Sequence, residues 1–167
     1  MNTPVACISL DAIQQNINVV RMMAANSKVM AVVKADAYGH GARQICQSIQ
    51  HVDALAVGRV SEGITLREAG IALPILVLEG FIDGIELEHC RIDRLVPVLH
   101  SDYQLALLGS GKHREMAVWL KVDSGMHRLG FTPEDFRRCV SSGTVTLLTP
   151  TSRITGKREI RSMYSSN

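Results

Sequence analysis

Short apolar runs rich in Val, Leu and Ile alternate with segments of helical periodicity from residue 28 almost to residue 148. Such near-continuous runs are typical of strands that are buried on both faces of a parallel sheet. Strands are therefore predicted at residues 28–35, 54–60, 74–80, 95–100, 117–123 and 144–148. Helices are predicted at residues 11–25, 41–50, 61–69, 82–90, 102–109 and 133–141. The alternation predicts an α/β fold with a parallel sheet.

The length of the repeat narrows the architecture. One strand and one helix together take about twenty residues, which favours a (β/α)8 barrel of the TIM type over a doubly wound sheet. A complete barrel takes about 250 residues, whereas this chain has 167. We therefore expect an incomplete barrel of about five to six strand–helix units within residues 1–148. Residues 149–167 contain seven Ser or Thr and no apolar periodicity, so we expect a disordered tail there.

Charge and hydropathy restrict the partners. Residues 149–167 hold four of the 18 Lys and Arg and one of the 16 Asp and Glu, which leaves residues 1–148 with a net charge of −1. A near-neutral body with 4% aromatic residues offers no basic stripe and no base-stacking platform, so nucleic acid is not an expected partner. No apolar run approaches the roughly 20 residues that span a bilayer, and no signal peptide opens the chain. We therefore expect a cytoplasmic protein without a membrane partner.

Cysteine and histidine spacing gives no sign of a metal site. Cysteines occur about forty residues apart without a Cys-x-x-Cys pair, which argues against zinc and against a disulfide framework. We expect reduced, buried side chains at Cys7, Cys46, Cys90 and Cys139. The histidines outside the motif described next lack metal-ligand spacing and are predicted to be polar surface or loop residues. They are His51, His89, His100, His113 and His127.

Lys34 ends the first apolar run, within the sequence Val-Val-Lys-Ala-Asp-Ala-Tyr-Gly-His-Gly of residues 32–41. The carboxyl ends of the strands are where a (β/α)8 barrel places its reactive groups. Val and Ala on either side partly desolvate the lysine, which favours the neutral amine that forms a Schiff base. Tyr38 can offer its hydroxyl to an anion, and Gly39 and Gly41 permit a sharp turn. Taken alone, Lys34 fits a structural lysine that reaches solvent equally well.

The ten-residue segment resembles the pyridoxal phosphate site of the bacterial alanine racemases, whose motif reads Val-Lys-Ala-(Asn/Asp)-Ala-Tyr-Gly-His-Gly. The resemblance implies that Lys34 forms the Schiff base with pyridoxal 5′-phosphate and acts as the base on the D-alanine face. It implies that Tyr38 binds the cofactor phosphate. It also implies the family's reaction, in which a homodimer interconverts L-alanine and D-alanine and supplies D-alanine for the peptidoglycan of the cell wall.

A second motif, Leu-Lys-Val-Asp-Ser-Gly-Met-His-Arg-Leu-Gly-Phe at residues 120–131, resembles the family's Leu-Lys-x-(Asp/Asn)-(Thr/Ser)-Gly-Met-x-Arg-Leu-Gly. The resemblance implies that Arg128 contacts the substrate carboxylate and the phenolic oxygen of the cofactor. A planar guanidinium matches a carboxylate, which is a physical reason for Arg at this position. Lys121 matches a lysine that is often carbamylated in the family and then orients that arginine. Without the first motif, Arg128 would be interpreted as a solvated loop charge.

The resemblance covers residues 5–148. Residues 11–17 and 62–70 also resemble helices of the family, although amphipathic periodicity explains both segments. Beyond residue 148 nothing matches the family's ring-stacking histidine, its arginine at the pyridine nitrogen, or the C-terminal domain with the tyrosine that acts on L-alanine. We therefore expect a truncated alanine racemase chain that is weakly active or inactive.

Two alternatives stay open from the sequence. The first is a single-domain pyridoxal phosphate-binding homeostasis protein, which shares the barrel but not the Ala-Tyr-Gly-His-Gly sequence. The second is a non-catalytic fragment that associates with full-length subunits. The motif at residues 32–41 favours the racemase over the first alternative.

Overall fold

The computed structural model describes residues 5–109, 113 and 116–141. Within them, five strands form one sheet in the order β1-β2-β3-β4-β5, and every neighbouring pair is parallel. The strands are β1 (Met30–Val32), β2 (Ala54–Val57), β3 (Ile75–Val77), β4 (Leu95–Leu99) and β5 (Trp119–Leu120). Because all strands run the same way, their carboxyl ends share one edge of the sheet, hereafter the C-terminal edge.

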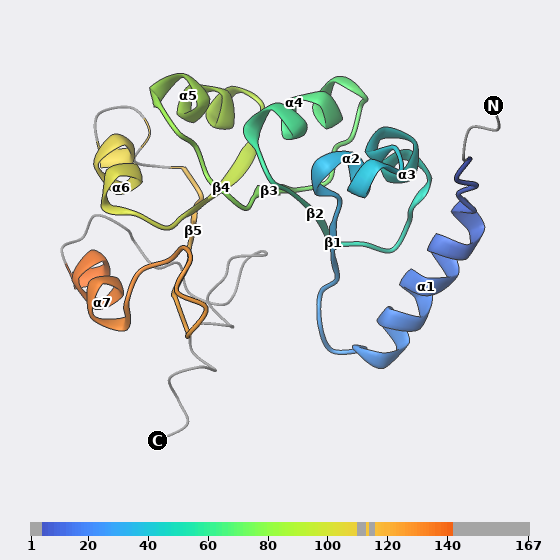
Figure 1. Cartoon of the computed structure of the whole chain (residues 1–167), viewed down its shortest axis with the longest axis horizontal. Coiled ribbons are helices and arrows are strands. Elements are labelled where there is room, and N and C mark those ends of the chain that lie inside the picture. Colours follow the sequence, from blue (N-terminus) through green and yellow to red (C-terminus); the bar gives the residue numbers. More distant parts are fainter. Residues whose placement is uncertain (1–4, 110–112, 114–115, 142–167) are drawn as a thin grey trace.

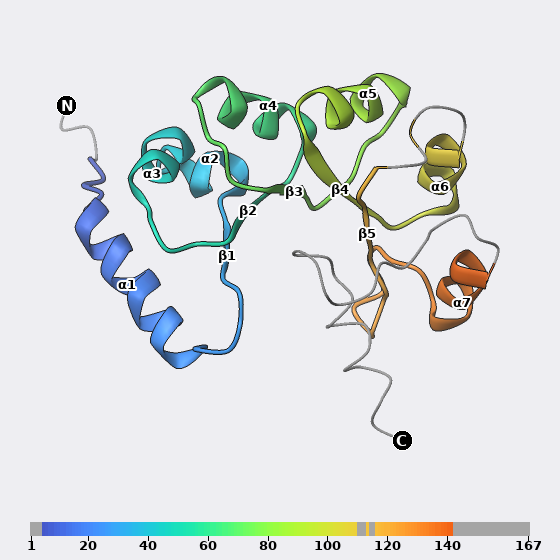
Figure 2. The same ribbon diagram turned by 180° about the vertical axis from the view of Figure 1, so that it is seen from behind.

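Seven helices accompany the strands in the described part of the chain. They are α1 (Leu10–Met23), α2 (Lys34–Gly39), α3 (Ala42–Ser48), α4 (Val60–Glu68), α5 (Gly84–Ile92), α6 (Asp102–Gly109) and α7 (Pro133–Ser141). In both views the helices α2 to α6 lie in an arc along one side of the sheet, and α1 lies beyond β1 (Figures 1 and 2). Strands in sequential order, each followed by a helix on the same side, are the arrangement of a (β/α)8 barrel. The predicted fold class is confirmed, with five strands of the barrel described.

Burial separates the central strands from the outer ones. All residues of β2 and β3 are buried, as the apolar runs predicted. The residues of β1 and β5 are half-buried or exposed, so the prediction of burial on both faces is wrong for them. The physical reason is their position, because each pairs with one neighbour only among the described residues. The predicted strand 144–148 and the predicted tail 149–167 lie outside the described residues.

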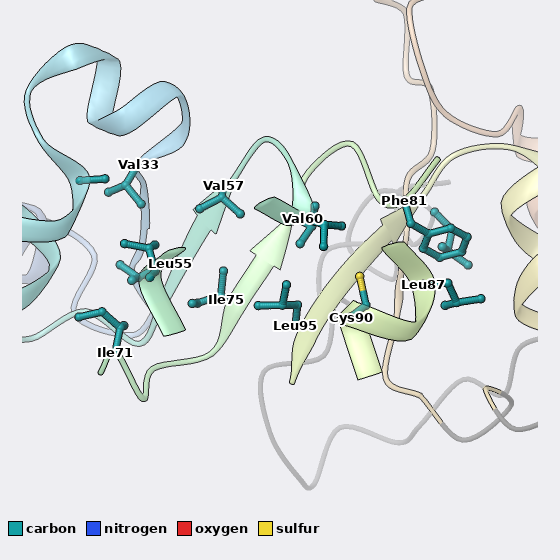
Figure 3. Packing of buried hydrophobic residues seen from close by; sticks show 14 of the residues in the cluster. Val33, Leu55, Val57, Val60, Ile71, Ile75, Phe81, Leu87, Cys90 and Leu95 are labelled. Atoms are coloured by element: carbon teal, nitrogen blue, oxygen red, sulfur yellow. The ribbon is translucent and has the colours of Figure 1, made fainter. Parts of the chain in front are cut away.

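The core forms two layers because successive strand residues point to opposite faces. On the helix side, alternate residues of β2 and β3 pack against the helices, and Figure 3 shows these side chains meeting those of α4 and α5. On the other side, Ala54 and Ala56 of β2 form a smaller cluster with Leu76 and Val98. Full burial of a Val, Leu or Ile side chain contributes about 1.5–3 kcal/mol. The sheet–helix layer contains most of these side chains and therefore dominates the stability.

Polar side chains set where two of the helices begin. The Ser9 hydroxyl accepts a hydrogen bond of 3.2 Å from the Ala12 N–H at the start of α1. Asp83 accepts bonds of 2.9 and 2.8 Å from the first-turn N–H groups of Ile85 and Glu86. A carboxylate that caps the first turn satisfies N–H groups that lack partners inside the helix. The predicted helix 82–90 therefore begins only at Gly84, because Asp83 is its cap.

Three of the four cysteines are buried as predicted, and Cys7 is exposed, so the prediction is wrong there. Cys7 precedes α1 in a segment that belongs to no helix or strand. Burial raises the pKa of Cys46 to about 11 and of Cys90 to about 12, which disfavours the reactive thiolate.

None of the described helices has the length and apolar character that a membrane span requires.

His113 corrects the expectation of surface histidines, because only 8% of it is exposed. Its Nε2 atom lies 3.7 Å from the Glu88 carboxylate of α5, so the ring faces that helix instead of solvent.

Candidate functional site

Lys34 lies at the C-terminal edge, two residues beyond β1 and at the first position of α2. The prediction placed it inside the strand. The ladder continues through Val33, whose N–H donates to the Ala56 carbonyl at 2.8 Å, and the chain then leaves the sheet. Lys34 is half-buried. A reactive side chain at this edge of the sheet is what the sequence predicted, although the strand ends earlier.

The backbone after Lys34 forms a left-handed turn. The four residues from Ala35 to Tyr38 have φ values of 51–58°, and Gly39 and Gly41 have φ values of 82° and 87°. The expected turn at the two glycines is confirmed. The sequence did not predict the preceding left-handed residues, because each costs an L-amino acid about 1–2 kcal/mol. Such a conformation persists only where its surroundings hold it in place.

Hydrogen bonds within the motif hold part of this turn. The Ala37 N–H donates to the Val33 carbonyl at 2.9 Å, and the Gly41 N–H donates to the Asp36 carbonyl at 3.0 Å. The Asp36 carboxylate accepts a bond of 2.7 Å from the Ala42 N–H at the first position of α3. Asp36 therefore joins the turn to the next helix, which is a structural use for an acidic residue in the motif.

Glu62, at the start of helix α4, holds the beginning of the left-handed turn that follows Lys34. Its Oε1 accepts a bond of 2.6 Å from the Ala35 N–H. Its Oε2 accepts bonds of 2.6 Å from the Gly58 N–H and 3.0 Å from the Arg59 N–H. The carboxylate thus joins the ends of β1 and β2. The predicted helix 61–69 places Glu62 near its start but gives it no role beside Lys34, because the contact to Ala35 crosses between two strands.

Gly58 leaves space beside Lys34. A Cβ atom at Gly58 would lie 3.2 Å from Glu62 Oε2, 3.7 Å from Lys34 Cβ and 3.8 Å from Glu79 Oε1. Arg59 pairs with Glu79 at 3.8 Å on the exposed side of this group. Lys34, Glu62 and Glu79, which follow β1, β2 and β3, therefore converge on one glycine at the C-terminal edge.

Tyr38 and His40 occupy the outer part of the turn. The Tyr38 side chain is 62% exposed, so its hydroxyl is accessible to an external anion. His40 Nδ1 lies 2.9 Å from the Ala37 carbonyl oxygen, to which it donates when it carries a proton. His40 thus supports the turn, whereas Tyr38 is open for binding.

The second motif forms a loop after β5. The Phe131 N–H donates to the Lys121 carbonyl at 2.8 Å, and the Asp123 N–H donates to the Phe131 carbonyl at 2.9 Å, which closes the loop. Inside it, Asp123 Oδ1 accepts bonds of 3.0 Å from the N–H groups of Gly125 and His127. These bonds lower the pKa of the Asp123 carboxyl below its ordinary value, and the bond from Gly125 has the largest effect. The carboxylate is therefore the internal support of the loop.

Arg128 is exposed near the end of this loop, and Lys121 is half-buried at its start, directly after β5. Gly130, with φ 128°, closes the turn where a Cβ would lie 2.7 Å from the Asp123 nitrogen. Since β1 and β5 are the outer strands of the described sheet, Lys34 and Arg128 follow opposite ends of the strand order. Three strands therefore lie between β1 and β5 in the sheet. The structure places both at the C-terminal edge but brings them into no direct contact.

The arrangement fits a carbonyl-bearing anionic cofactor better than a metal ion. The described residues contain no group of three or more His, Cys, Asp or Glu side chains that could hold a metal. The Lys34 ammonium makes no hydrogen bond or ion pair within the part of the chain that the structure describes. A half-buried amine that has no carboxylate partner among the described residues and lies beside a glycine suits condensation with an aldehyde.

Comparison with known proteins identifies the family of the chain. The family described as the alanine racemase N-terminal domain matches residues 8–145. The chain is 44% identical over 142 residues to an alanine racemase of Vibrio parahaemolyticus and 48% identical over 134 residues to one of Chromohalobacter salexigens. These matches cover 84% and 79% of this chain but 40% and 37% of the relatives. The chain therefore spans about two fifths of the length of the relatives it matches.

Solved structures give the same result. The alanine racemase of Acinetobacter baumannii matches with a TM-score of 0.75 and 30% identity, over 92% of this chain and 47% of that one. The biosynthetic alanine racemase of Pseudomonas aeruginosa matches with a TM-score of 0.73 and 37% identity, over 77% of this chain and 37% of that one. With a matched domain over residues 8–145, and relatives similar in both sequence and fold, this chain belongs to the alanine racemase family.

Proposed function

We propose that this chain carries the cofactor-binding lysine of an alanine racemase, and that the reaction it serves is the interconversion of L-alanine and D-alanine. The observation that carries the proposal is the half-buried Lys34, unpaired within the described residues, at the C-terminal edge of a chain that belongs to this family. The reaction, its supply of D-alanine for peptidoglycan, the homodimer and the cytoplasmic location are parts of the same proposal. So is the division into a barrel portion, residues 1–148, and a separate tail, residues 149–167.

The cofactor of the proposal is pyridoxal 5′-phosphate. When bound, it supplies an aldehyde that condenses with amines and a ring that delocalises the electron pair left on the α-carbon. The Lys34 amine would make the covalent bond, and the accessible Tyr38 hydroxyl would donate to the phosphate. The Arg128 guanidinium would bind the substrate carboxylate and the phenolic oxygen, and Lys121 would orient Arg128. Their common position at the C-terminal edge supports this assignment.

Lys34 would also move the proton at the α-carbon. Once the substrate amine has replaced it at the aldehyde, the freed, neutral Lys34 amine would take that proton on the D-alanine face and return it there, which is general base catalysis by a positioned amine. Racemisation needs a second base on the opposite face, and the resemblance assigns that base to a C-terminal tyrosine that residues 5–148 do not match. Loss of a positioned base costs about 10²- to 10⁴-fold in rate. We therefore expect a protein that holds Lys34 without that second base to exchange the α-proton of D-alanine with retention and to racemise L-alanine poorly.

Reductive trapping tests the proposal. The chain is incubated with pyridoxal phosphate, reduced with borohydride, digested and mapped by mass spectrometry. Label is expected at Lys34, and Lys34→Ala should abolish it, while the control Lys28→Ala should leave it unchanged. Label at Lys28, Lys112 or Lys121 in preference to Lys34 would refute the assignment.

Deuterium exchange tests the proton transfer. Proton NMR of each alanine enantiomer in deuterium oxide, with chain and cofactor present, should show loss of the α-proton from D-alanine that depends on Lys34. Rapid conversion of L-alanine to D-alanine by this chain would show that no second base from another domain is needed.

The homeostasis-protein alternative is not favoured, because the relatives with similar sequence are named alanine racemases. The motif at residues 32–41 points the same way.

A further inference from the structure

We propose that Glu62 is a positioning residue that fixes the reactive direction of Lys34. The inference rests on the proposed function, because it concerns how the Lys34 amine meets the cofactor aldehyde. Glu62 touches neither cofactor nor substrate in this proposal. It acts through the backbone of the residue that follows the lysine.

Glu62 contacts the backbone of the residue that follows Lys34. The Ala35 N–H donates to Glu62 Oε1 at 2.6 Å, and Ala35 is both the neighbour of Lys34 and the first residue of the left-handed turn. An L-residue leaves the left-handed region unless its surroundings hold it. Because the direction of the Lys34 side chain depends on the backbone on either side of it, the contact that holds Ala35 also directs the amine.

The two oxygens of the Glu62 carboxylate accept hydrogen bonds from different strand ends. Oε1 serves Ala35 at the end of β1, whereas Oε2 serves Gly58 and Arg59 at the end of β2. An amide in place of the carboxylate has one acceptor oxygen and one N–H2 group, which only donates. The oxygen of Glu62→Gln would turn toward the two N–H groups of Gly58 and Arg59, and its N–H2 group would face the Ala35 N–H. The substitution therefore releases Ala35 selectively.

Glu86, in the neighbouring strand–helix unit, is a matched control for Glu62. Glu86 is the third residue of α5, as Glu62 is of α4, and it accepts a bond of 2.9 Å from the Ile82 N–H of the preceding loop. Both glutamates are half-buried and both serve loop amides. Only Glu62 contacts the residue after Lys34, so Glu86→Gln removes the same charge from a first turn that accepts a loop N–H, without touching the turn after Lys34.

The experiment measures the reactivity of Lys34 in the full chain in two ways. The first is the concentration of pyridoxal phosphate that gives half-maximal borohydride-trapped label at Lys34. The second, without cofactor, is the rate at which acetic anhydride acylates Lys34 relative to Lys28. We expect Glu62→Gln to raise the half-maximal concentration by about tenfold, the loss expected for one charge-assisted bond. Glu86→Gln should change it by less than about twofold.

A second variant separates the effect of the negative charge from the effect of side-chain length. Glu62→Asp keeps the negative charge but is one methylene shorter, so it retains the contact to Arg59 in its own helix turn and loses Ala35. It should shift the labelling as Glu62→Gln does. In both variants, hydrogen exchange of the Ala35 amide should accelerate by about tenfold relative to wild type. Far-UV circular dichroism selects variants that remain folded.

The outcomes are distinct. If Glu62→Gln and Glu62→Asp label Lys34 with the wild-type concentration dependence, the inference is wrong. It is equally wrong if Glu86→Gln produces the same shift, because the effect would then be one of general stability. If the wild-type chain takes no cofactor at Lys34, the proposed function fails, and the acylation ratio and the Ala35 exchange rate still decide whether Glu62 directs the lysine.

Discussion

Helix α4 carries a charged side chain near each end, and the two serve opposite edges of the sheet. Glu62, in the first turn, accepts hydrogen bonds from backbone N–H groups at the C-terminal edge, beside Lys34. Arg67, in the last turn, donates to backbone carbonyls at the edge where the strands begin. In a barrel, reactive groups gather at the carboxyl ends of the strands, and the other end contributes stability. The same kind of contact therefore supports a reactive group at one end of α4 and the fold at the other.

Arg67 shows how complete the structural role is. Its guanidinium donates to the carbonyls of Ile71 at 2.6 Å, Leu73 at 2.7 Å, Asp93 at 2.9 Å and Arg94 at 2.9 Å. These carbonyls belong to the loop before β3 and to the loop before β4. Burial, and then the charge of Arg94, lowers the pKa of Arg67 from its ordinary value. One planar side chain with five N–H donors thus joins two loops, which a lysine could not do.

The largest effect is expected from Arg67→Met. It leaves four carbonyls without their charged donor, and we expect the free energy of unfolding to fall by about 3 kcal/mol. Urea unfolding followed by circular dichroism measures the change. Labelling of Lys34, corrected for the folded fraction, should stay at the wild-type level. Glu62→Gln, in contrast, is expected to weaken this labelling.

Arg91→Met is the matched control for that substitution. Arg91 bonds to Glu88 in the same helix at 2.6 Å on an exposed face. Removal of a surface ion pair changes stability little, so we expect Arg91→Met to unfold at nearly the wild-type urea concentration. Equal losses in Arg67→Met and Arg91→Met would contradict a special role for the edge where the strands begin.

The next effect tests whether the C-terminal edge also contains purely structural positions. Gly80 has φ 68°, and a Cβ there would lie 2.5 Å from Gln104 Nε2 and 2.7 Å from the Val98 carbonyl. Gly80→Ala should lower the free energy of unfolding by about 2 kcal/mol through steric overlap and left-handed strain. Thermal unfolding measures the loss. The control Gly84→Ala adds a Cβ with nothing within 4 Å, and a loss as large as that of Gly80→Ala would be inconsistent with this explanation.

A smaller effect is expected at Gly58, beside the candidate site. Gly58→Ala adds a methyl group 3.2 Å from Glu62 Oε2 and 3.7 Å from Lys34 Cβ. We expect a loss of stability of about 1 kcal/mol or less, because one carboxylate must shift by a few tenths of an ångström. The concentration of pyridoxal phosphate for half-maximal Lys34 labelling should rise by about threefold. A large stability loss with normal labelling would show that Gly58 supports the fold rather than the site.

The smallest effect concerns pH at the second motif. Backbone N–H bonds from Gly125 and His127 lower the pKa of the Asp123 carboxyl in the folded chain. The stabilisation of the loop is therefore present above the ordinary carboxyl pKa and is lost as the pH falls through the lowered value. Amide resonances of Gly125 and His127 followed by NMR during acid titration should shift together in that range. In Asp123→Asn this common transition should be absent, and its persistence would assign it to another group.

Local patterns in the sequence determined much of this protein. Near-continuous apolar runs predicted the described strands and their parallel direction, although burial on both faces holds only for the inner strands such as β2 and β3. The helices 102–109 and 133–141 match their predicted bounds, and the predicted helix 61–69 corresponds to α4. The two motifs identified the family, which the matching domain over residues 8–145 confirms. The roles of Lys34, Tyr38, Lys121 and Arg128 stay predictions.

Only the tertiary structure decided how these residues are supported. The left-handed turn after Lys34 opposes the preference of four L-residues, so no local propensity predicts it. The contact between Glu62 and Ala35 crosses from one strand to the next, over 27 positions in the chain. Arg67 likewise reaches carbonyls 26 and 27 positions away. A sequence records which side chains can donate or accept, but which backbone group each one meets depends on the packing of neighbouring strand–helix units, and that packing exists only once the sheet has formed.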